Sequence, residues 1–231
     1  MMTLVERRDR EKVGIRDLIL EAARELFVEQ GYEGVSMRKV AQRIDYSPTA
    51  IYLHFADKES LFKELCGRDF AQLAADFRQL STITDPKERL TACGRAYIEF
   101  AVAHPNHYRL MFMTPVNLPP SPEELKQRGN PDQDAYAFVR SLLVECLREG
   151  LFRPELKDAE LLAQTIWAAV HGVAALEITQ CSQGGMDWRS LRDRSDLMLE
   201  GIMHGLARDP APTNDLAATA DHCALERREV Y

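Results

Sequence analysis

The sequence has few of the features that mark an enzyme, a secreted protein or a metalloprotein. Its five cysteines are an odd number at wide spacings without a C-x-x-C pair, which argues against a zinc site and against a disulfide framework. His104 and His107 are three residues apart, but Pro105 lies between them and no acidic residue or cysteine nearby completes a ligand set. Gly-rich phosphate loops, nucleophile elbows and His-Glu-x-x-His motifs are all missing. We therefore expect no catalytic residues, no metal and no cofactor, with the thiols reduced in a cytoplasm.

The sequence also lacks targeting signals and strand patterns. The amino terminus is charged and has no apolar core segment, and we find no apolar run that approaches the length of a bilayer span. We expect a cytoplasmic protein without a membrane partner. Alternating polar and apolar residues, the mark of a half-buried strand, do not occur, whereas helical periodicity recurs along the chain. The sequence therefore predicts an all-α fold.

An excess of basic residues, typical of nucleic-acid binders, is missing as well: the formal net charge is -7. The positive charge is nevertheless concentrated locally, because Arg38, Lys39, Arg43 and Lys58 lie within one short stretch of sequence. We interpret this pattern as a local basic face on an acidic body.

That stretch, residues 36–62, predicts two short helices joined by a tight turn and followed by a new helix start. Ser36 can cap the first helix, Asp45 and Tyr46 make the turn, and Ser47 can cap the second helix. The second helix is about two turns long, so it needs tertiary packing through Ile51 and Phe55. This is the arrangement with which a helix-turn-helix offers side chains to the DNA major groove.

The second helix leaves hydrogen-bonding groups on its outer side, which suit base edges and phosphates. Lys58 follows at the first position of the next helix, where its ammonium group could reach the DNA backbone. The candidate DNA-binding residues are Ser36, Arg38, Lys39, Ser47, Thr49, Tyr52, His54 and Lys58.

The segment GYEGVSMRKVAQRIDYSPTAIYLHFADKESLF resembles the DNA-binding domain of the TetR family of bacterial transcriptional regulators. The Ser-Pro pair that opens the second helix and the Tyr-x-His-Phe sequence that closes it carry this resemblance. A looser one, through Trp-x-x-x-His-Gly at residues 167–172, points to the Trp-His-Gly subgroup of that family. The resemblance implies a helix-turn-helix domain over residues 15–60 and a ligand-binding and dimerisation domain over 61–207. We expect a flexible arm at 1–14 and a disordered tail at 208–231.

The second domain should consist of long helices. The periodicity and capping residues predict helices over residues 57–80, 85–103, 105–113, 132–149, 158–180 and 188–207. A Pro-rich loop over residues 114–131 is the expected mobile segment.

In the TetR family the last two long helices of each subunit form a four-helix dimer interface, and a short recognition helix needs a second copy to read a useful site. The residues expected in this interface are Ala168, Gly172, Ala175, Leu191, Met198 and Ile202. Family members also hold a small molecule among the middle helices. The candidate ligand-binding residues are Phe70, Phe77, Tyr97, Phe100, Tyr108, Met111, Phe112, Trp167 and His171, which suggest an apolar or aromatic ligand.

Two functions follow from these patterns. The first is a dimeric repressor that leaves a pseudo-palindromic operator in double-stranded DNA when a small molecule binds. The second is a helical small-molecule-binding protein or enzyme whose helix-turn-helix is vestigial. The exposed hydrogen-bonding face of the second helix favours the first, although activation in place of repression stays open.

Overall fold

The computed structural model describes residues 4–116, 118–181 and 185–208, with side chains from Gly14 onward. All regular elements in this part are helices, as the sequence predicts, apart from one isolated bridge between Phe152 and Ala207. The helices are α1 (Leu4–Gly34), α2 (Met37–Arg43), α3 (Pro48–Tyr52), α4 (Lys58–Gln79), η1 (Leu80–Thr82), α5 (Pro86–Ala103), α6 (Pro105–Tyr108), η2 (Arg109–Met113), α7 (Pro122–Gln127), α8 (Ala135–Arg148), α9 (Ala159–Thr179) and α10 (Leu191–Leu206).

The starts of α2 and α3 coincide with the predicted capping residues. The Ser36 and Ser47 hydroxyls accept hydrogen bonds from the backbone N–H groups of Lys39 and Ala50, at 3.3 and 3.2 Å. Asp57 closes a capping box at the start of α4. These contacts satisfy backbone donors that the first turn of a helix leaves free.

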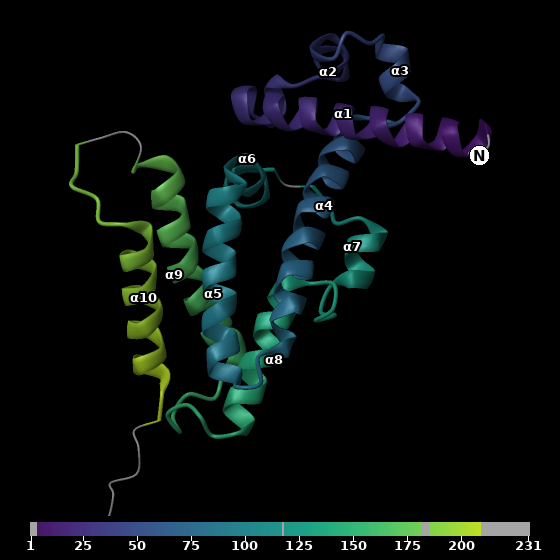
Figure 1. Ribbon diagram of the computed structural model, residues 1–231. Helices are drawn as coiled ribbons and strands as arrows, with labels where there is room; N and C mark the ends of the chain where they lie inside the picture. The colour runs from purple at the N-terminus through teal and green to yellow at the C-terminus, as the bar shows by residue number, and fades with distance from the viewer. Residues whose placement is uncertain (1–3, 117, 182–184, 209–231) are drawn as a thin grey trace, which may run out of the picture.

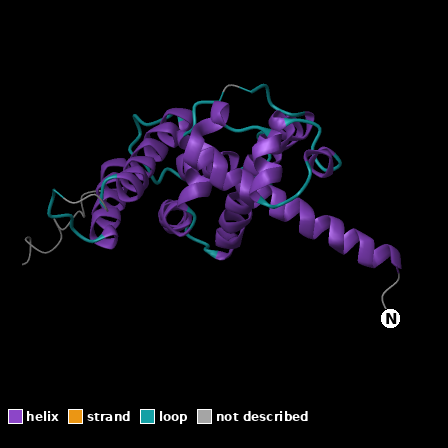
Figure 2. Ribbon diagram, turned by 90° about the horizontal axis from the view of Figure 1, so that it is seen from above, coloured by secondary structure: helices purple, strands orange, loops and turns teal. Residues whose placement is uncertain are grey.

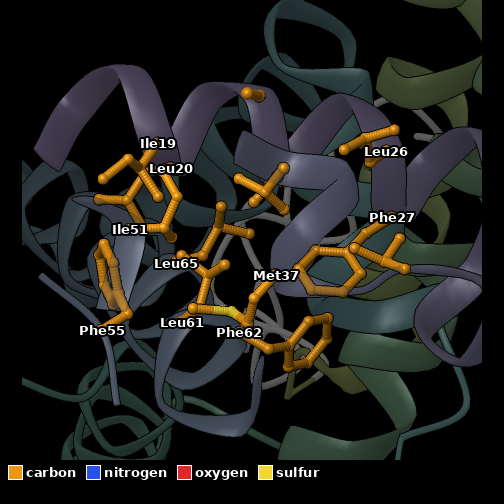
Figure 3. Packing of buried hydrophobic residues seen from close by; sticks show 14 of the residues in the cluster. Ile19, Leu20, Leu26, Phe27, Met37, Ile51, Phe55, Leu61, Phe62 and Leu65 are labelled. Atoms are coloured by element: carbon orange, nitrogen blue, oxygen red, sulfur yellow. The ribbon is translucent and has the colours of Figure 1, made fainter. Parts of the chain in front are cut away.

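The amino-terminal domain packs α1, α2, α3 and the first turns of α4 around one apolar core (Figure 3). Ile19 and Phe27 of α1, Ile51 of α3 and Leu61 of α4 all lie in this core with almost no solvent exposure. Because α3 is too short to be stable alone, this packing holds it in place.

α1 is longer than the sequence suggests at both ends. It begins at Leu4, inside the segment expected to be an arm, and its first turns project from the rest of the molecule (Figure 2). At the other end Gly31 takes φ 70°, which breaks the regular helix where the sequence predicts its end, and a further turn follows to Gly34.

α4 connects the two domains. Figure 1 shows α4 running from the amino-terminal domain down beside α5 and α8. Its first half, including Leu65, belongs to the amino-terminal core, and its second half, with Leu73 and Phe77, belongs to a second core shared with α5, α8 and α9. A third cluster joins α8 and α9 near Cys146 and Leu162. α10 packs along the outside of α5 and α9.

Three expectations need correction. The loop predicted over residues 114–131 contains a helix, α7, whose Ser121 and Glu124 form a capping box. The helix expected over 105–113 changes to a π-helical turn at Arg109. α9 is long enough, at 21 residues and a mean hydropathy of 1.4, to span a bilayer, so the expectation that no apolar run reaches this length is wrong. Residues 209–231 of the expected tail lie outside the described residues.

Candidate nucleic-acid interface and ligand cavity

The helix-turn-helix has the geometry that the sequence predicts. α2 ends at Arg43 with Ile44 as its C-cap, and Asp45 takes φ 56°, the left-handed conformation that turns the chain after a helix. The backbone N–H of Tyr46 then donates to the carbonyl of Ala41 at 2.9 Å, so the turn is tied back onto α2. α3 starts directly afterwards with Pro48 at its first position.

The outer side of α3 carries most of the predicted reading residues. Ser47, Thr49 and Tyr52 are exposed, whereas Ile51 on the opposite side is fully buried. His54 is half-buried, and its carbonyl accepts a 2.7 Å hydrogen bond from Arg16 of α1. Arg16 also lies over the Phe55 ring and pairs with Glu64, so α1 and α4 together fix the end of the recognition helix.

Most side chains of the predicted basic cluster are already bound to other groups of the chain. The Lys58 ammonium donates to the carbonyl of Tyr32 at 2.9 Å and lies 4.1 Å from the centre of that ring. Lys39 donates to Gln30 and to the carbonyl of Gly34, both at 2.7 Å.

Arg43 pairs with Glu25 and Glu29 of α1. Arg38 is the one cation of the cluster without a hydrogen bond or ion pair to the described residues. The carbonyls at the end of α1 and the acidic residues on its surface therefore compete with DNA phosphates for three of the four predicted cations.

A buried charged network lies where the two domains meet, and no local pattern in the sequence predicts it. Arg24 of α1 binds both carboxylate oxygens of Asp69 on α4, at 2.5 and 3.0 Å, and both side chains are almost fully buried. His107 of α6 contacts the same carboxylate at 2.9 Å. Burial lowers the pKa of His107, in spite of the opposing effect of Asp69. The three side chains join α1, α4 and α6 at one point.

A cavity of about 840 Å³ lies among α4, α5, α8 and α9. This volume falls within the range of small-molecule sites. Six of the nine predicted ligand residues line it: Phe70, Phe77, Tyr97, Met111, Phe112 and Trp167. The Phe112 ring contacts the rings of Phe70 and Tyr97, at centroid distances of 5.5 and 5.6 Å, so aromatic surface forms much of one wall.

The other three predicted ligand residues do not line the cavity. Phe100 packs in the second core, and Tyr108 is fully buried. His171 is half-buried, and it contacts the cavity-lining residues Tyr97, through a hydrogen bond, and Phe112 and Trp167, through their rings. Periodicity places aromatic residues on the inner side of a helix but does not separate core positions from cavity positions.

A chain of hydrogen bonds leads from the cavity wall into the core, through Trp167, Tyr97, Tyr108 and His171. The Trp167 indole donates to the Tyr97 hydroxyl at 3.0 Å, and the hydroxyls of Tyr97 and Tyr108 lie 3.1 Å apart. The Tyr108 hydroxyl lies 2.5 Å from Nδ1 of His171. Burial raises the pKa of Tyr97 to about 12 and also raises that of Tyr108, whereas it lowers that of His171. All three are therefore neutral near pH 7, and in this chain the Tyr108 hydroxyl donates its hydrogen bond to Nδ1 of His171.

Sequence reasoning missed the polar rim of the cavity. Residues after η2 contribute Glu124, Gln127, Arg128 and Gln133 to its lining, and Tyr136 donates to Glu160 beside them. The one sequence signal in this segment is the capping-box spacing of α7. It predicts the start of a helix, but it does not predict that the helix borders a cavity.

The outer face of α9 is apolar and open. Leu161, Ala168 and Leu176 are exposed along it, and nothing lies within 4 Å of where a Gly172 side chain would be. On neighbouring α10, Leu197 is 73% exposed. Ala175 is half-buried.

Three residues of the expected dimer interface, all on α10, are partly buried within the chain. Leu191 and Met198 pack against the second core, and Ile202 packs against the third. Their side of α10 packs on α5 and α9, and Leu197 is the most exposed large apolar residue of this helix.

The described cysteines are unpaired. Cys66, Cys93 and Cys146 are buried, and burial raises the pKa of the first two thiols to about 12 and that of Cys146 to about 11. Such thiols are poor nucleophiles at neutral pH. Groups of three or more metal-ligating side chains are not found among the residues that the structure describes.

Comparisons with known proteins agree with this architecture. The sequence model of bacterial regulatory proteins of the tetR family matches residues 19–65, and that of a tetracyclin repressor-like C-terminal domain matches residues 90–202. The HTH-type transcriptional activator FasR of Mycolicibacterium smegmatis is 36% identical over 98 residues, which are 42% of this chain and 45% of FasR. The match therefore spans less than half of that relative's length.

The fatty acid metabolism regulator protein of Bacillus subtilis is 29% identical over 159 residues, or 66% of this chain and 77% of the relative. The crystal structure of the TetR family regulator PfmR from Thermus thermophilus superimposes with a TM-score of 0.64 at 24% identity, over 82% of this chain and 99% of PfmR. With a helix-turn-helix held on α1 and α4 and a helical second domain behind it, this chain belongs to the TetR family of bacterial regulatory proteins.

Proposed function

We propose that the chain is a dimeric, sequence-specific DNA-binding regulator. It acts as a repressor that leaves a pseudo-palindromic operator when a small apolar or aromatic ligand binds in the second domain. DNA binding places its action in the cytoplasm. The observation that carries the proposal is the course of α4, which begins beside the recognition helix and ends in the wall of the cavity.

The DNA contact rests on the outer side of α3. Ser47, Thr49 and Tyr52 present hydroxyl groups there, and a buried face fixes the helix from below. Hydroxyl groups can bind both phosphate oxygens and base edges. Arg38 is the best placed of the four cations for a phosphate, since the others have partners within the chain.

A homodimer would explain why the outer face of α9 is apolar and exposed in the single chain. The small residues Ala168 and Gly172 let a second helix approach closely, and Leu161 and Leu176 on either side supply exposed apolar area. A two-fold dimer through this face would present two recognition helices to two half-sites.

The ligand site is the cavity beside α4. Its aromatic wall favours an apolar or aromatic molecule, and its polar rim can orient one end of it. One relative is named a fatty acid metabolism regulator, which is in keeping with an apolar ligand.

Two elements can carry ligand occupancy to the DNA-binding domain. α4 contributes Phe70 and Phe77 to the cavity and Leu61 and Leu65 to the amino-terminal core. The π-helical turn η2 does the same over a shorter distance, because Leu110 packs in the amino-terminal core while Met111 and Phe112 line the cavity. A ligand that displaces either element changes the position of the recognition helix.

In vitro selection from random duplex DNA at near-physiological salt tests the proposal. We expect an enriched pseudo-palindrome, which then serves as the probe for compounds that release the protein. The matched variant for the ligand site is Val139→Phe, because Val139 lines the cavity and a larger side chain there takes up space for the ligand without touching the helix-turn-helix. It should keep DNA binding and lose the response to the ligand.

Other outcomes would contradict the proposal in identifiable ways. Failure of folded, dimeric protein to enrich any sequence would favour the helical binding protein or enzyme with a vestigial motif. Release of Val139→Phe at the same ligand concentration as the wild type would place the ligand outside the cavity.

A further inference from the structure

Leu53 is an apolar side chain in an unusual position. It is 82% exposed, the highest exposed fraction among the large apolar side chains in the described part of the chain. It belongs to none of the three buried clusters. A single exposed leucine elsewhere on a surface needs no explanation. Leu53, however, caps the end of the recognition helix α3.

Helix geometry places Leu53 in the middle of the reading face. Successive residues of a helix are about 100° apart, so a residue two positions on lies roughly 200° around the axis. Ile51 is fully buried beneath α3 (Figure 3), and Leu53 therefore points to the opposite side. Thr49, four residues earlier, shares that side with Leu53. Tyr52 lies on the flank, and the backbone carbonyl of His54 is bound by Arg16.

The chemistry of a leucine side chain limits what it can recognise on DNA. It has no donor or acceptor, so neither a phosphate nor the polar edge of a base is a partner for it. The apolar group that the major groove offers is the C5-methyl group of thymine. We propose that Leu53 contacts a thymine methyl group in each half-site and is a specificity-determining residue of this regulator. This inference rests on the proposed DNA binding.

The test removes the methyl group from the DNA. Each thymine of the selected operator is replaced in turn by 2′-deoxyuridine, which keeps the polar edge of the base and lacks the methyl group. We expect one or two positions per half-site at which this replacement weakens wild-type binding roughly fourfold, the factor for burying about one methyl group. Leu53→Ala should weaken binding to the thymine operator by a similar factor and should no longer distinguish the two bases.

Two variants serve as controls. Leu53→Met keeps an apolar side chain and should still prefer thymine. Leu125 is 54% exposed on α7, and Leu125→Ala should bind both operators as the wild type does. Since Leu53 packs against no core, Leu53→Ala should keep its helical content.

The inference is overturned if Leu53→Ala retains the full preference for thymine over deoxyuridine at every position. It also fails if Leu53→Ala loses affinity equally for both operators, which would indicate a contact other than the methyl group. A failed selection with folded protein contradicts the proposed function itself, and is distinguished by the lack of any operator.

Discussion

The buried pair of Arg24 and Asp69 offers a quantitative test of how the two domains are joined. Their side chains are 7% and 5% exposed, and Asp69 accepts three contacts, two from Arg24 and one from His107. In Asp69→Ala the guanidinium stays buried and keeps only the 3.4 Å contact of its Nε with Glu21. Breaking a buried ion pair from one side typically costs about 3–5 kcal/mol of unfolding free energy. We expect a loss in this range.

The surface pair of Arg68 and Asp17 is a matched control. It joins the same two helices, with Nη1 of Arg68 2.6 Å from the Asp17 carboxylate, but its side chains are 47% and 54% exposed. Exposed pairs contribute little to stability, since solvent screens them. Asp17→Ala should therefore have almost no effect.

Urea unfolding followed by circular dichroism measures the unfolding free energy of each variant and of the wild type. All are compared at one fixed protein concentration, because the stability of a dimer depends on concentration. The double variant Arg24→Met/Asp69→Leu should regain most of the stability, since apolar side chains of similar volume can replace a buried pair. A loss below about 1 kcal/mol for Asp69→Ala, equal to that of Asp17→Ala, would refute the reasoning.

Three further predictions concern the DNA contact, the dimer and the buried histidine. Lys58→Ala should leave the salt dependence of DNA binding nearly unchanged, because its ammonium group is bound to the Tyr32 carbonyl; a slope reduced by about one would instead show a phosphate contact. Gly172→Leu should keep the fold, since its site is open within the chain, and should weaken dimerisation in sedimentation experiments, whereas Gly172→Ala should stay dimeric. Because burial lowers the pKa of His171, the unfolded chain takes up a proton that the folded chain does not as the pH falls below about 6.5, so unfolding free energy should decrease there. His171→Gln should show a smaller decrease, and equal pH slopes for the two proteins would contradict this.

The helix-turn-helix was predictable because local signals determine it. Ser36, Ser47 and Asp57 are short-range capping residues, and each starts a helix where the sequence predicts one. Five of the six predicted helical segments of the second domain followed for the same reason, since periodicity and caps are read within a few residues, whereas the segment 105–113 divides into α6 and the π-helical turn η2.

The positions of charges and cavities were not predictable in this way. Lys39 and Lys58 look free in sequence, but their partners are carbonyls at the end of α1, which only the tertiary fold brings near. Asp69 and Arg24 are 45 residues apart and give no local signal. Tyr108 and Phe112 have the same character in sequence, yet one is core and the other lines the cavity.

The composition of α9 can be understood from the two surfaces that this helix must satisfy. Its length and hydropathy would fit a bilayer, but only 28% of its most apolar window is buried within the chain. One side packs against α5 and α8, and the other carries Leu161, Ala168 and Leu176 in the open. A membrane is not needed to explain this second side, because a second copy packed against it would bury the same residues. The small side chains favour that explanation, since they allow close approach of a helix, whereas lipid contact makes no such demand on side-chain size.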